Sequence, residues 1–405
     1  MAGHWLRIGR AVAAGYRGGV LDEPAAPPPA HRVHLDAGGN ARLHPLARRA
    51  LLQAIDDGWS DPRRLHSESR RAAALLAGAR EALAASLGAR TEEIHLAPSH
   101  TGALHAAVAA TTNGRRRVGT TAVASTVERA ALLAATDHAA SETELVPVDR
   151  LGHVDVERLA AAVSRPGVAL AALQHSNGEV GTLQPVDRAH AAARAAGVPL
   201  LVDAGAAVGH VAVGSAWDLL AADPADWGGP AGVGVLAVRQ QVRWSPTWPA
   251  DPDRWFPGGV SVPSAFAAAV ALQARDDERV ETAARHRRLV DRLRTRIPEL
   301  VPDVEVVGPA VDRLPHVVTF SCLFVDGEAL VTELDKAGFT VGSGSACAST
   351  TVEPSHVLAA MGVLTHGNVR IALDDTTSDE DVERFLGALP LAVGRVRSTL
   401  GVDGL

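Results

Sequence analysis

Cys347 is a residue whose type and surroundings point to nucleophilic chemistry. It lies in a run of small residues from Gly342 to Thr350 that could present an exposed thiol. The thiolate is the reactive form of cysteine, and its fraction depends on neighbouring charges that a sequence does not reveal. An inert loop cysteine is the alternative. Further along the chain, the guanidinium of Arg370 could bind a carboxylate through a bidentate pair of hydrogen bonds. An ordinary ion pair at a strand edge is the alternative.

Lysine is nearly absent from the chain. Of the 39 lysine and arginine residues, Lys336 is the one lysine and the other 38 are arginine. Such a bias is typical of GC-rich coding, which exchanges solvated lysines for arginine at little cost. A guanidinium cannot deprotonate to a nucleophilic amine, so this exchange should not reach a lysine that forms a Schiff base. The single lysine therefore limits any mechanism that needs an amine.

The elements that must position these residues alternate between helix and strand. This alternation predicts an α/β fold with a large, mostly parallel sheet covered on both faces. After the segment 244–260, rich in Trp, Pro and Gly, we expect a long helix over 263–298 and a strand over 316–324. We expect an N-terminal segment and Pro-rich linker over 1–31, a large α/β domain over 32–258, and a smaller C-terminal α/β domain over 259–405 that carries the cysteine loop. In the large domain, helices are expected over 45–57, 67–87, 101–110 and 186–196, and strands over 117–124, 168–175, 199–203 and 232–238.

Composition limits the classes of partner. The net charge is −7 and no stretch is both basic and aromatic, which argues against nucleic acid. The two cysteines cannot build a disulfide framework, and the N-terminus has no sustained apolar run of signal-peptide or membrane length. Cys322 sits in an alternating strand pattern and is expected in the core. We expect a cytoplasmic protein without membrane, nucleic-acid or metal site.

Three segments together resemble the cysteine desulfurase branch of the class V aminotransferases, which are fold-type I enzymes dependent on pyridoxal phosphate (PLP). The resemblance extends from about residue 34 to about residue 389. It implies a fold-type I architecture and a homodimer, with an active desulfurase or a sulfur acceptor protein as further partners. The segments are 174–185, 201–209, and 342–350 followed by Glu353-Pro354-Ser355-His356-Val357-Leu358.

The resemblance places Asp226 at the position of the lysine that binds PLP. The family has a Gly-Pro-x-Gly-x-Gly turn after that lysine, and Gly229 to Gly234 fits it. Counting back from this turn puts Asp226 at the lysine and Asp223 at the start of the same motif. An aspartate cannot form a Schiff base, and two acidic residues oppose binding of an anionic phosphate. We therefore expect no covalent PLP in this chain.

The other cofactor positions implied by the resemblance are partly altered. Thr101 matches the phosphate-binding hydroxyl, with an N-cap role as the alternative, and Asp203 matches the partner of the pyridinium nitrogen. Arg129 replaces the stacking histidine and cannot shuttle protons at neutral pH. Asn177 precedes Gly178, which replaces a second asparagine, so Asn177 is expected to form a turn. Ser261 matches the residue that reaches the partner subunit's phosphate, and Ala206 replaces a glutamine.

Cys347 and Arg370, the positions that still match the family, suggest three functions. In the family, the residue matching Cys347 becomes a persulfide and the residue matching Arg370 holds the substrate carboxylate. A non-catalytic or sulfur-accepting paralogue in sulfur transfer fits these residues and the altered cofactor positions. One alternative is an active desulfurase or C–S lyase that holds PLP non-covalently through Asp203 and Thr101. Another is an amino-acid-binding protein without enzymatic activity, anchored on Arg370.

Overall fold

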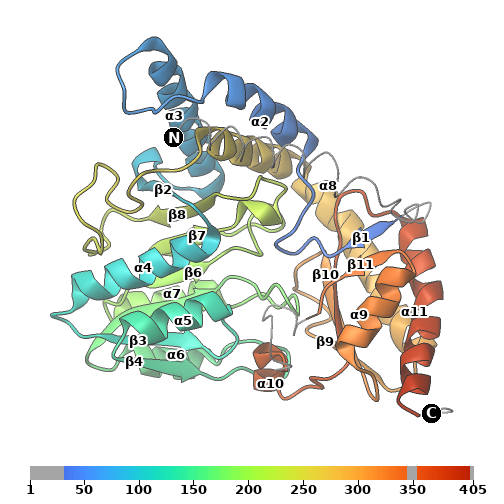
Figure 1. The fold of residues 1–405 in the computed structure, drawn as a ribbon. Coiled ribbons are helices and arrows are strands. Elements are labelled where there is room, and N and C mark those ends of the chain that lie inside the picture. The colour runs from blue at the N-terminus through green and yellow to red at the C-terminus, as the bar shows by residue number, and fades with distance from the viewer. Residues whose placement is uncertain (1–31, 344–353, 402–405) are drawn as a thin grey trace, which may run out of the picture.

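The larger lobe is built on a seven-stranded sheet. The computed structural model describes residues 32–343 and 354–401 (Figure 1). The strand order is β2-β8-β7-β6-β5-β3-β4. The pairs from β7 to β4 are parallel, whereas β8 runs antiparallel to β7 and β2. The prediction of a mostly parallel sheet is confirmed. The strands are β2 (Ile94–Ala97), β3 (Thr121–Ser125), β4 (Glu142–Val146), β5 (Val168–Gln174), β6 (Leu200–Asp203), β7 (Leu219–Ala222) and β8 (Gly234–Val238).

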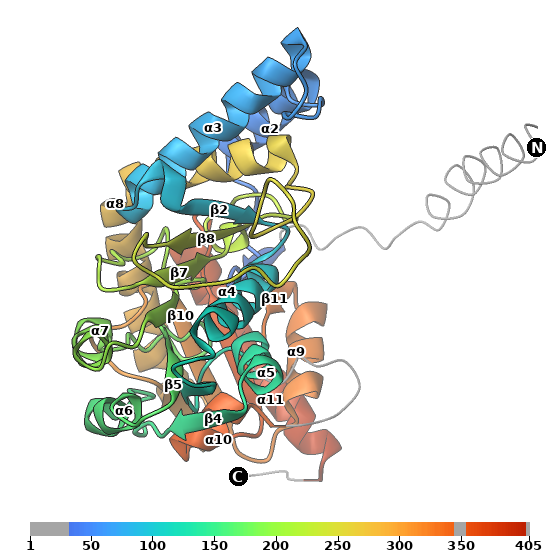
Figure 2. The ribbon, with the colours of Figure 1, turned by 90° about the vertical axis from the view of Figure 1, so that its left-hand side faces the viewer.

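Helices cover both faces of this sheet (Figure 2). Successive side chains of a strand point to opposite faces, and in β5 Leu170 and Ala172 join the core under α4 and α5. Ala171 and Leu173 join the opposite core, with α6 and α7. Burial on both faces explains why β5 reads as a continuous apolar run. The helices of these layers are α4 (His100–Arg115), α5 (Ala130–Ala139), α6 (Val156–Val163) and α7 (Val186–Ala195).

The smaller lobe contains two short sheets. One is antiparallel, in the order β12-β10-β9, and the other is the parallel pair β1-β11. The helices α9 and α11 lie beside these sheets, and α10 lies near the boundary of the lobes (Figure 1). The bounds are β1 (Val33–Leu35), β9 (Val304–Val307), β10 (Val317–Cys322), β11 (Phe339–Val341), β12 (Asn368–Ala372), α9 (Gly327–Lys336), α10 (His356–Met361) and α11 (Asp379–Thr399).

The long helix α8 (Val262–Leu300) is shared by the two lobes. Its first half contributes Ala265 and Leu272 to the core of the larger lobe, where α2 (Pro45–Asp57) and α3 (Ser67–Leu87) also pack. Its second half contributes Leu293 and Ile297 to the core of the smaller lobe. The helices expected over 45–57, 67–87 and 263–298 therefore form, but the expected domain boundary near residue 259 falls at the start of a helix that both lobes use.

The first described strand also departs from the predicted domain bounds. β1 lies within the range expected for the large domain, yet it pairs in parallel with β11 of the smaller lobe, with Val33 opposite Phe339. Val33 and Leu35 are buried in the smaller core. The pairing is a long-range contact that no local pattern encodes. The first described strand therefore belongs to the smaller lobe, and the residues that follow it form the larger lobe.

Among the described residues, no helix combines the length and apolar character that a membrane span requires.

Candidate functional site

A buried ion-pair group lies where β6 ends. Asp203 is the last residue of β6, His100 is the first residue of α4, and Arg129 immediately precedes α5. Nε2 of His100 lies 3.0 Å from Asp203 Oδ1, and Nε of Arg129 lies 3.2 Å from Asp203 Oδ2. The backbone N–H of Gly205 also donates to Asp203 Oδ1, at 2.9 Å. The carboxylate is 3% exposed, so all its bonding is with the protein.

Asp203 and Arg129 favour each other's charged form. Burial alone would raise the pKa of Asp203, but the charges of His100 and Arg129 outweigh it and hold that pKa well below its usual range. Burial would likewise lower the pKa of Arg129, and the carboxylates of Asp203, Asp226 and Asp223 raise it instead. Opposite charges at close range favour the charged forms. At neutral pH Asp203 is therefore a carboxylate already engaged by two side chains.

Asp226 lies beside this group on a short 3-10 helix, η2 (Pro224–Asp226). The turn forms because Asp223 Oδ1 accepts from the N–H of Ala225 and Pro224 occupies its first position. Asp226 is 2% exposed, and its Oδ1 accepts from the N–H of Gly39 at 2.9 Å. Burial and the nearby Asp223 carboxylate raise the pKa of Asp226 to about 7. The structure thus brings Asp226 close to Asp203 and Arg129, three residues that the resemblance assigns to cofactor positions.

The single lysine of the chain does not belong to this group of side chains. Lys336 ends α9 in the smaller lobe, and its side chain is 64% exposed. Its Nζ lies 2.6 Å from Glu333 Oε1, one turn earlier on the same helix. It forms a surface i,i+3 ion pair, as expected for a solvated helix end.

Asn177 forms a turn, as expected. Its Oδ1 accepts from the N–H groups of Glu179 and Val180, both at 2.9 Å, and its Nδ2 donates to the carbonyl of Val127. The neighbouring Gly178 and Ala206 are packed against each other, because a Cβ on Gly178 would lie 3.1 Å from that of Ala206. The two small residues that stand where the family has an asparagine and a glutamine are therefore neighbours in the structure.

The N-terminus of α4 is capped by Ser99 rather than Thr101. Ser99 Oγ accepts from the N–H of Gly102 at 3.0 Å, and Thr101 is the second residue of the helix with an exposed side chain. The N-cap alternative for Thr101 is therefore wrong, whereas its phosphate role stays a prediction. Ser261 caps α8 by accepting from the N–H of Ser264 and is also exposed. Its contact with a partner subunit likewise stays a prediction.

Arg370 is engaged within the chain. Its Nη2 donates to Asp36 Oδ1 at 2.6 Å, and its backbone pairs with Gly342, just before the cysteine loop. Cys347 itself lies outside the described residues. On the far side of the loop, Nε2 of His356 lies 2.9 Å from the carbonyl oxygen of Glu128, next to Arg129. The described residues that flank the loop therefore contact Arg370 on one side and the backbone of Glu128, the neighbour of Arg129, on the other.

Cys322 is a core residue, as its strand pattern predicts. It is fully buried in β10, and burial raises the pKa of its thiol to about 12. The thiol is protonated at neutral pH and does not offer a second nucleophile.

His100 is the member of the ion-pair group that sequence reasoning missed. It is the first residue of α4 and contacts Asp203, and β8 approaches this helix end closely. Gly234 allows that approach, since a Cβ there would lie 2.4 Å from the backbone of Ser99. A polar residue directly before the expected helix start at Thr101 was the one available signal.

Glu128 should make the fold less stable as pH rises. It is fully buried, and burial raises the pKa of its carboxyl from 4.5 to about 8, although Ser125 Oγ donates to it at 2.5 Å. Below about pH 4.5 the group is protonated in both states. Between pH 4.5 and 8 the unfolded chain releases the proton that the folded chain keeps, so stability falls by about 5 kcal/mol.

The variant Glu128→Gln tests this effect, because glutamine keeps the shape without titrating. We expect its free energy of unfolding, relative to that of the unsubstituted chain, to increase steadily from pH 5 to pH 8. Chemical denaturation at several pH values measures the difference. A difference independent of pH would contradict the assignment of a protonated carboxyl.

Comparison with known proteins identifies the family and supports this fold. Residues 33–385 match the family model of the aminotransferase class V. The chain belongs to this PLP-dependent family, in which it resembles the cysteine desulfurases. A cysteine desulfurase from Cereibacter sphaeroides is 35% identical over 386 residues, which cover 91% of this chain and 97% of the relative. The cysteine desulfurase NifS of Azotobacter vinelandii is 30% identical over 382 residues, covering 90% and 94%.

Solved structures confirm the fold class. A NifS-like protein superposes with a TM-score of 0.82 at 23% identity, covering 92% of this chain and 100% of that protein. The apo cysteine desulfurase of Thermococcus onnurineus NA1 superposes with a TM-score of 0.77 at 22% identity, covering 89% and 94%. The architecture is the fold-type I fold that the sequence predicts.

The side chains around Asp226 do not fit a covalently held PLP. The cofactor's aldehyde needs an amine, and this group of charged residues offers carboxylates, an imidazole and a guanidinium. Asp203, the expected partner of the ring nitrogen, already bonds His100 and Arg129. Asp223 and Asp226 are acidic residues, and their ionised forms would oppose binding of an anionic cofactor.

Proposed function

We propose that this chain is a desulfurase-like protein that has lost the covalent cofactor chemistry of its family and acts in sulfur transfer by accepting sulfur at Cys347. The observation that carries the proposal is the group of His100, Asp203 and Arg129 beside Asp226, in which the Asp203 carboxylate already contacts two side chains. This group supplies no amine. A positioned general base is worth ~10²–10⁴ in rate, and the altered positions remove both proton carriers that the resemblance implies.

Sulfur acceptance needs a thiolate and no bound cofactor. Sγ of Cys347 would attack the outer sulfur of a persulfide on a donor protein, such as an active desulfurase. A new S–S bond forms at Cys347 while the donor's S–S bond breaks, and the donor leaves as a thiolate that takes up the released proton. The exchange is balanced without an oxidant or reductant. The described residues on either side of the loop make contacts of their own, Gly342 with the backbone of Arg370 and His356 with the carbonyl oxygen of Glu128.

Transfer of radiolabelled sulfur tests the proposal. An active desulfurase is loaded with labelled cysteine and mixed with this chain, and non-reducing gels follow the label. We expect label on the unsubstituted chain and on Cys322→Ser, because Cys322 is a buried and protonated thiol. Cys347→Ser should carry less than about a tenth of it. Equal labelling of the two variants would exclude Cys347 as the acceptor, and no labelling of the unsubstituted chain would reject sulfur transfer.

The alternative of an active enzyme with non-covalent PLP is tested by turnover. It requires Asp203 to release His100 or Arg129 and serve the ring nitrogen. We expect no sulfide or alanine above the buffer rate when the chain, PLP and cysteine are incubated at high enzyme concentration. Release above that rate would replace our proposal.

The amino-acid-binding alternative depends on Arg370. The carboxylate of Asp36 already occupies Nη2 of this arginine at 2.6 Å, so a ligand carboxylate would have to displace it. We therefore favour sulfur transfer over this function.

We also propose that the chain forms a homodimer, as its resemblance implies. Apolar side chains on α2 and just after it are largely exposed, namely Leu52, Ile55 and Trp59. Exposed apolar side chains close together favour protein association. Sedimentation velocity would measure the mass in solution.

A further inference from the structure

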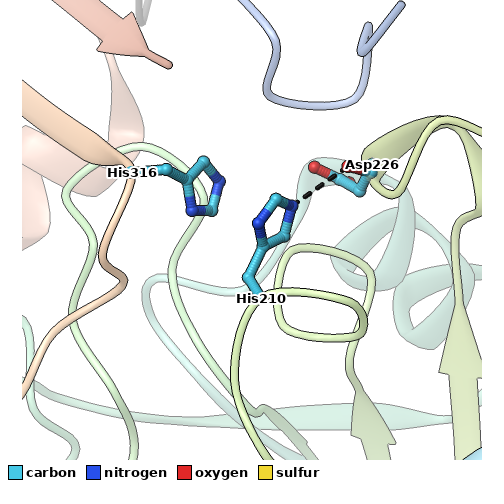
Figure 3. Close-up of side chains that lie close together, drawn as sticks. All are labelled: His210, Asp226 and His316. Atoms are coloured by element: carbon cyan, nitrogen blue, oxygen red, sulfur yellow. Dashed lines mark hydrogen bonds between the residues drawn. The ribbon is translucent and has the colours of Figure 1, made fainter. Parts of the chain in front are cut away.

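Three side chains with metal-binding atoms meet at the boundary between the lobes. His210 follows β6 and Asp226 ends η2, both in the larger lobe, whereas His316 directly precedes β10 of the smaller lobe. One nitrogen of each imidazole and one carboxylate oxygen all lie within 4.8 Å of one another. Figure 3 shows the two rings side by side, with Asp226 next to His210.

The two imidazoles present lone pairs rather than positive charges. Their ring centroids are 3.7 Å apart and their planes differ by 19°, a distance at which two imidazolium ions would repel strongly. Nε2 of His210 lies 3.0 Å from the backbone carbonyl oxygen of Asp226 and must donate to it. In the neutral ring Nδ1 of His210 is then the free acceptor. Such a bond from the second ring nitrogen to a carbonyl is characteristic of histidines that bind metals.

His316 carries a polar atom that lacks a partner. The side chain is 1% exposed, and its Nδ1 has no hydrogen bond to any part of the chain that the structure describes. An unsatisfied buried polar atom costs about 1–3 kcal/mol. On the other side of the group, Asp226 uses Oδ1 for the amide of Gly39, which orients the carboxylate as outer contacts do in metal sites.

We propose that His210, Asp226 and His316 form a binding site for a divalent transition-metal ion of the zinc type. Two imidazole nitrogens and one carboxylate are a donor set suited to zinc, with a fourth position left for water or a substrate atom. Zn²⁺ binds these ligands at about 2.0–2.2 Å. Binding therefore requires the ligand atoms to draw closer than the present 4.8 Å limit and the stacked rings to turn apart.

The site would connect the two lobes at the position where the family has its lysine. Replacing an amine by a carboxylate exchanges a cation for an anionic ligand, which suits a metal ion. Asp223 adds negative charge nearby, and the neighbouring Arg275 is paired with Asp375. This inference shares Asp226 with the proposed function but does not use Cys347, so zinc binding and sulfur transfer to Cys347 are tested separately. It departs from the sequence-based expectation of no metal site, because His210 and His316 are 106 positions apart in the chain.

Metal binding by the full, untagged chain tests the site. The chelator-treated protein is titrated with Zn²⁺ in a calorimeter and, after dialysis, its metal content is measured by mass spectrometry. We expect one equivalent of zinc per chain, a higher melting temperature with zinc, and no effect of Mg²⁺, which prefers all-oxygen sites. Less than half an equivalent of zinc would overturn the proposal.

Matched variants locate the site. Asp226→Asn and His316→Gln should each weaken zinc binding at least about 10-fold. His286→Gln is the control, because His286 is also buried, its ring lies 6.4 Å from that of His316, and its Nε2 contacts the carbonyl of Asp374 instead. Equal affinity in all three variants would refute the assigned ligands. The visible absorption of the Co²⁺-loaded unsubstituted chain gives a readout that needs no variant, and a purely six-coordinate spectrum would also count against a four-coordinate site.

Discussion

Replacing Asp203 by asparagine is expected to lower the free energy of unfolding by about 3 kcal/mol. The carboxylate is 3% exposed and holds both His100 and Arg129. Removing one partner of a buried ion pair leaves the other charge uncompensated, which costs about 3–5 kcal/mol. The lower end applies because the Arg129 side chain is 39% exposed and water can solvate part of it. Urea denaturation of both proteins measures the loss.

A second ion pair of the chain supplies a matched control. Arg32 is also 39% exposed, but its partner Asp335 is 57% exposed. Asp335→Asn should therefore cost less than about 1 kcal/mol. Adding Arg129→Gln to Asp203→Asn should recover part of the loss, because the unpaired cation is then removed. A loss below 1 kcal/mol for Asp203→Asn would show that the group contributes little to the fold.

Replacing Asp226 by lysine is expected to give the chain a covalently bound PLP. Burial would keep the new amine partly deprotonated, as would the charge of Arg129, and an unprotonated amine attacks an aldehyde. After incubation with PLP and reduction with borohydride, mass spectrometry should find the adduct near one per chain. The same treatment of the unsubstituted chain should leave residue 226 unmodified.

The near absence of lysine makes this experiment unusually clean. In a Lys336→Arg background, the introduced amine is the only lysine in the chain. Asp226→Arg in the same background is the control, since its guanidinium adds a similar charge without a nucleophilic amine. If a folded Asp226→Lys variant takes up no cofactor, the ion-pair group itself excludes PLP, and the missing lysine is not the sole cause.

Local sequence determined the elements and the family. Helices over 45–57 and 67–87 and the buried run of β5 follow from apolar spacing, because each residue's environment repeats along one helix face or one strand face. Spacing from the turn at Gly229 was also enough to assign Asp226 to the position of the family's lysine. A shared motif locates a residue because proteins of one fold place matching sequence positions at matching points of the backbone.

Only the tertiary structure decided what those positions contact. No spacing predicts that His100 reaches Asp203, that Asp36 occupies Arg370, or that His316 from the smaller lobe stacks on His210. Each contact joins segments far apart in sequence, and each depends on side-chain direction and on how closely backbones approach. The sequence by itself thus determined the fold-type I family and the prediction that Asp226 stands at the lysine position. Packing between distant segments decided that Asp226 lies beside the group of His100, Asp203 and Arg129 and near the imidazoles of His210 and His316.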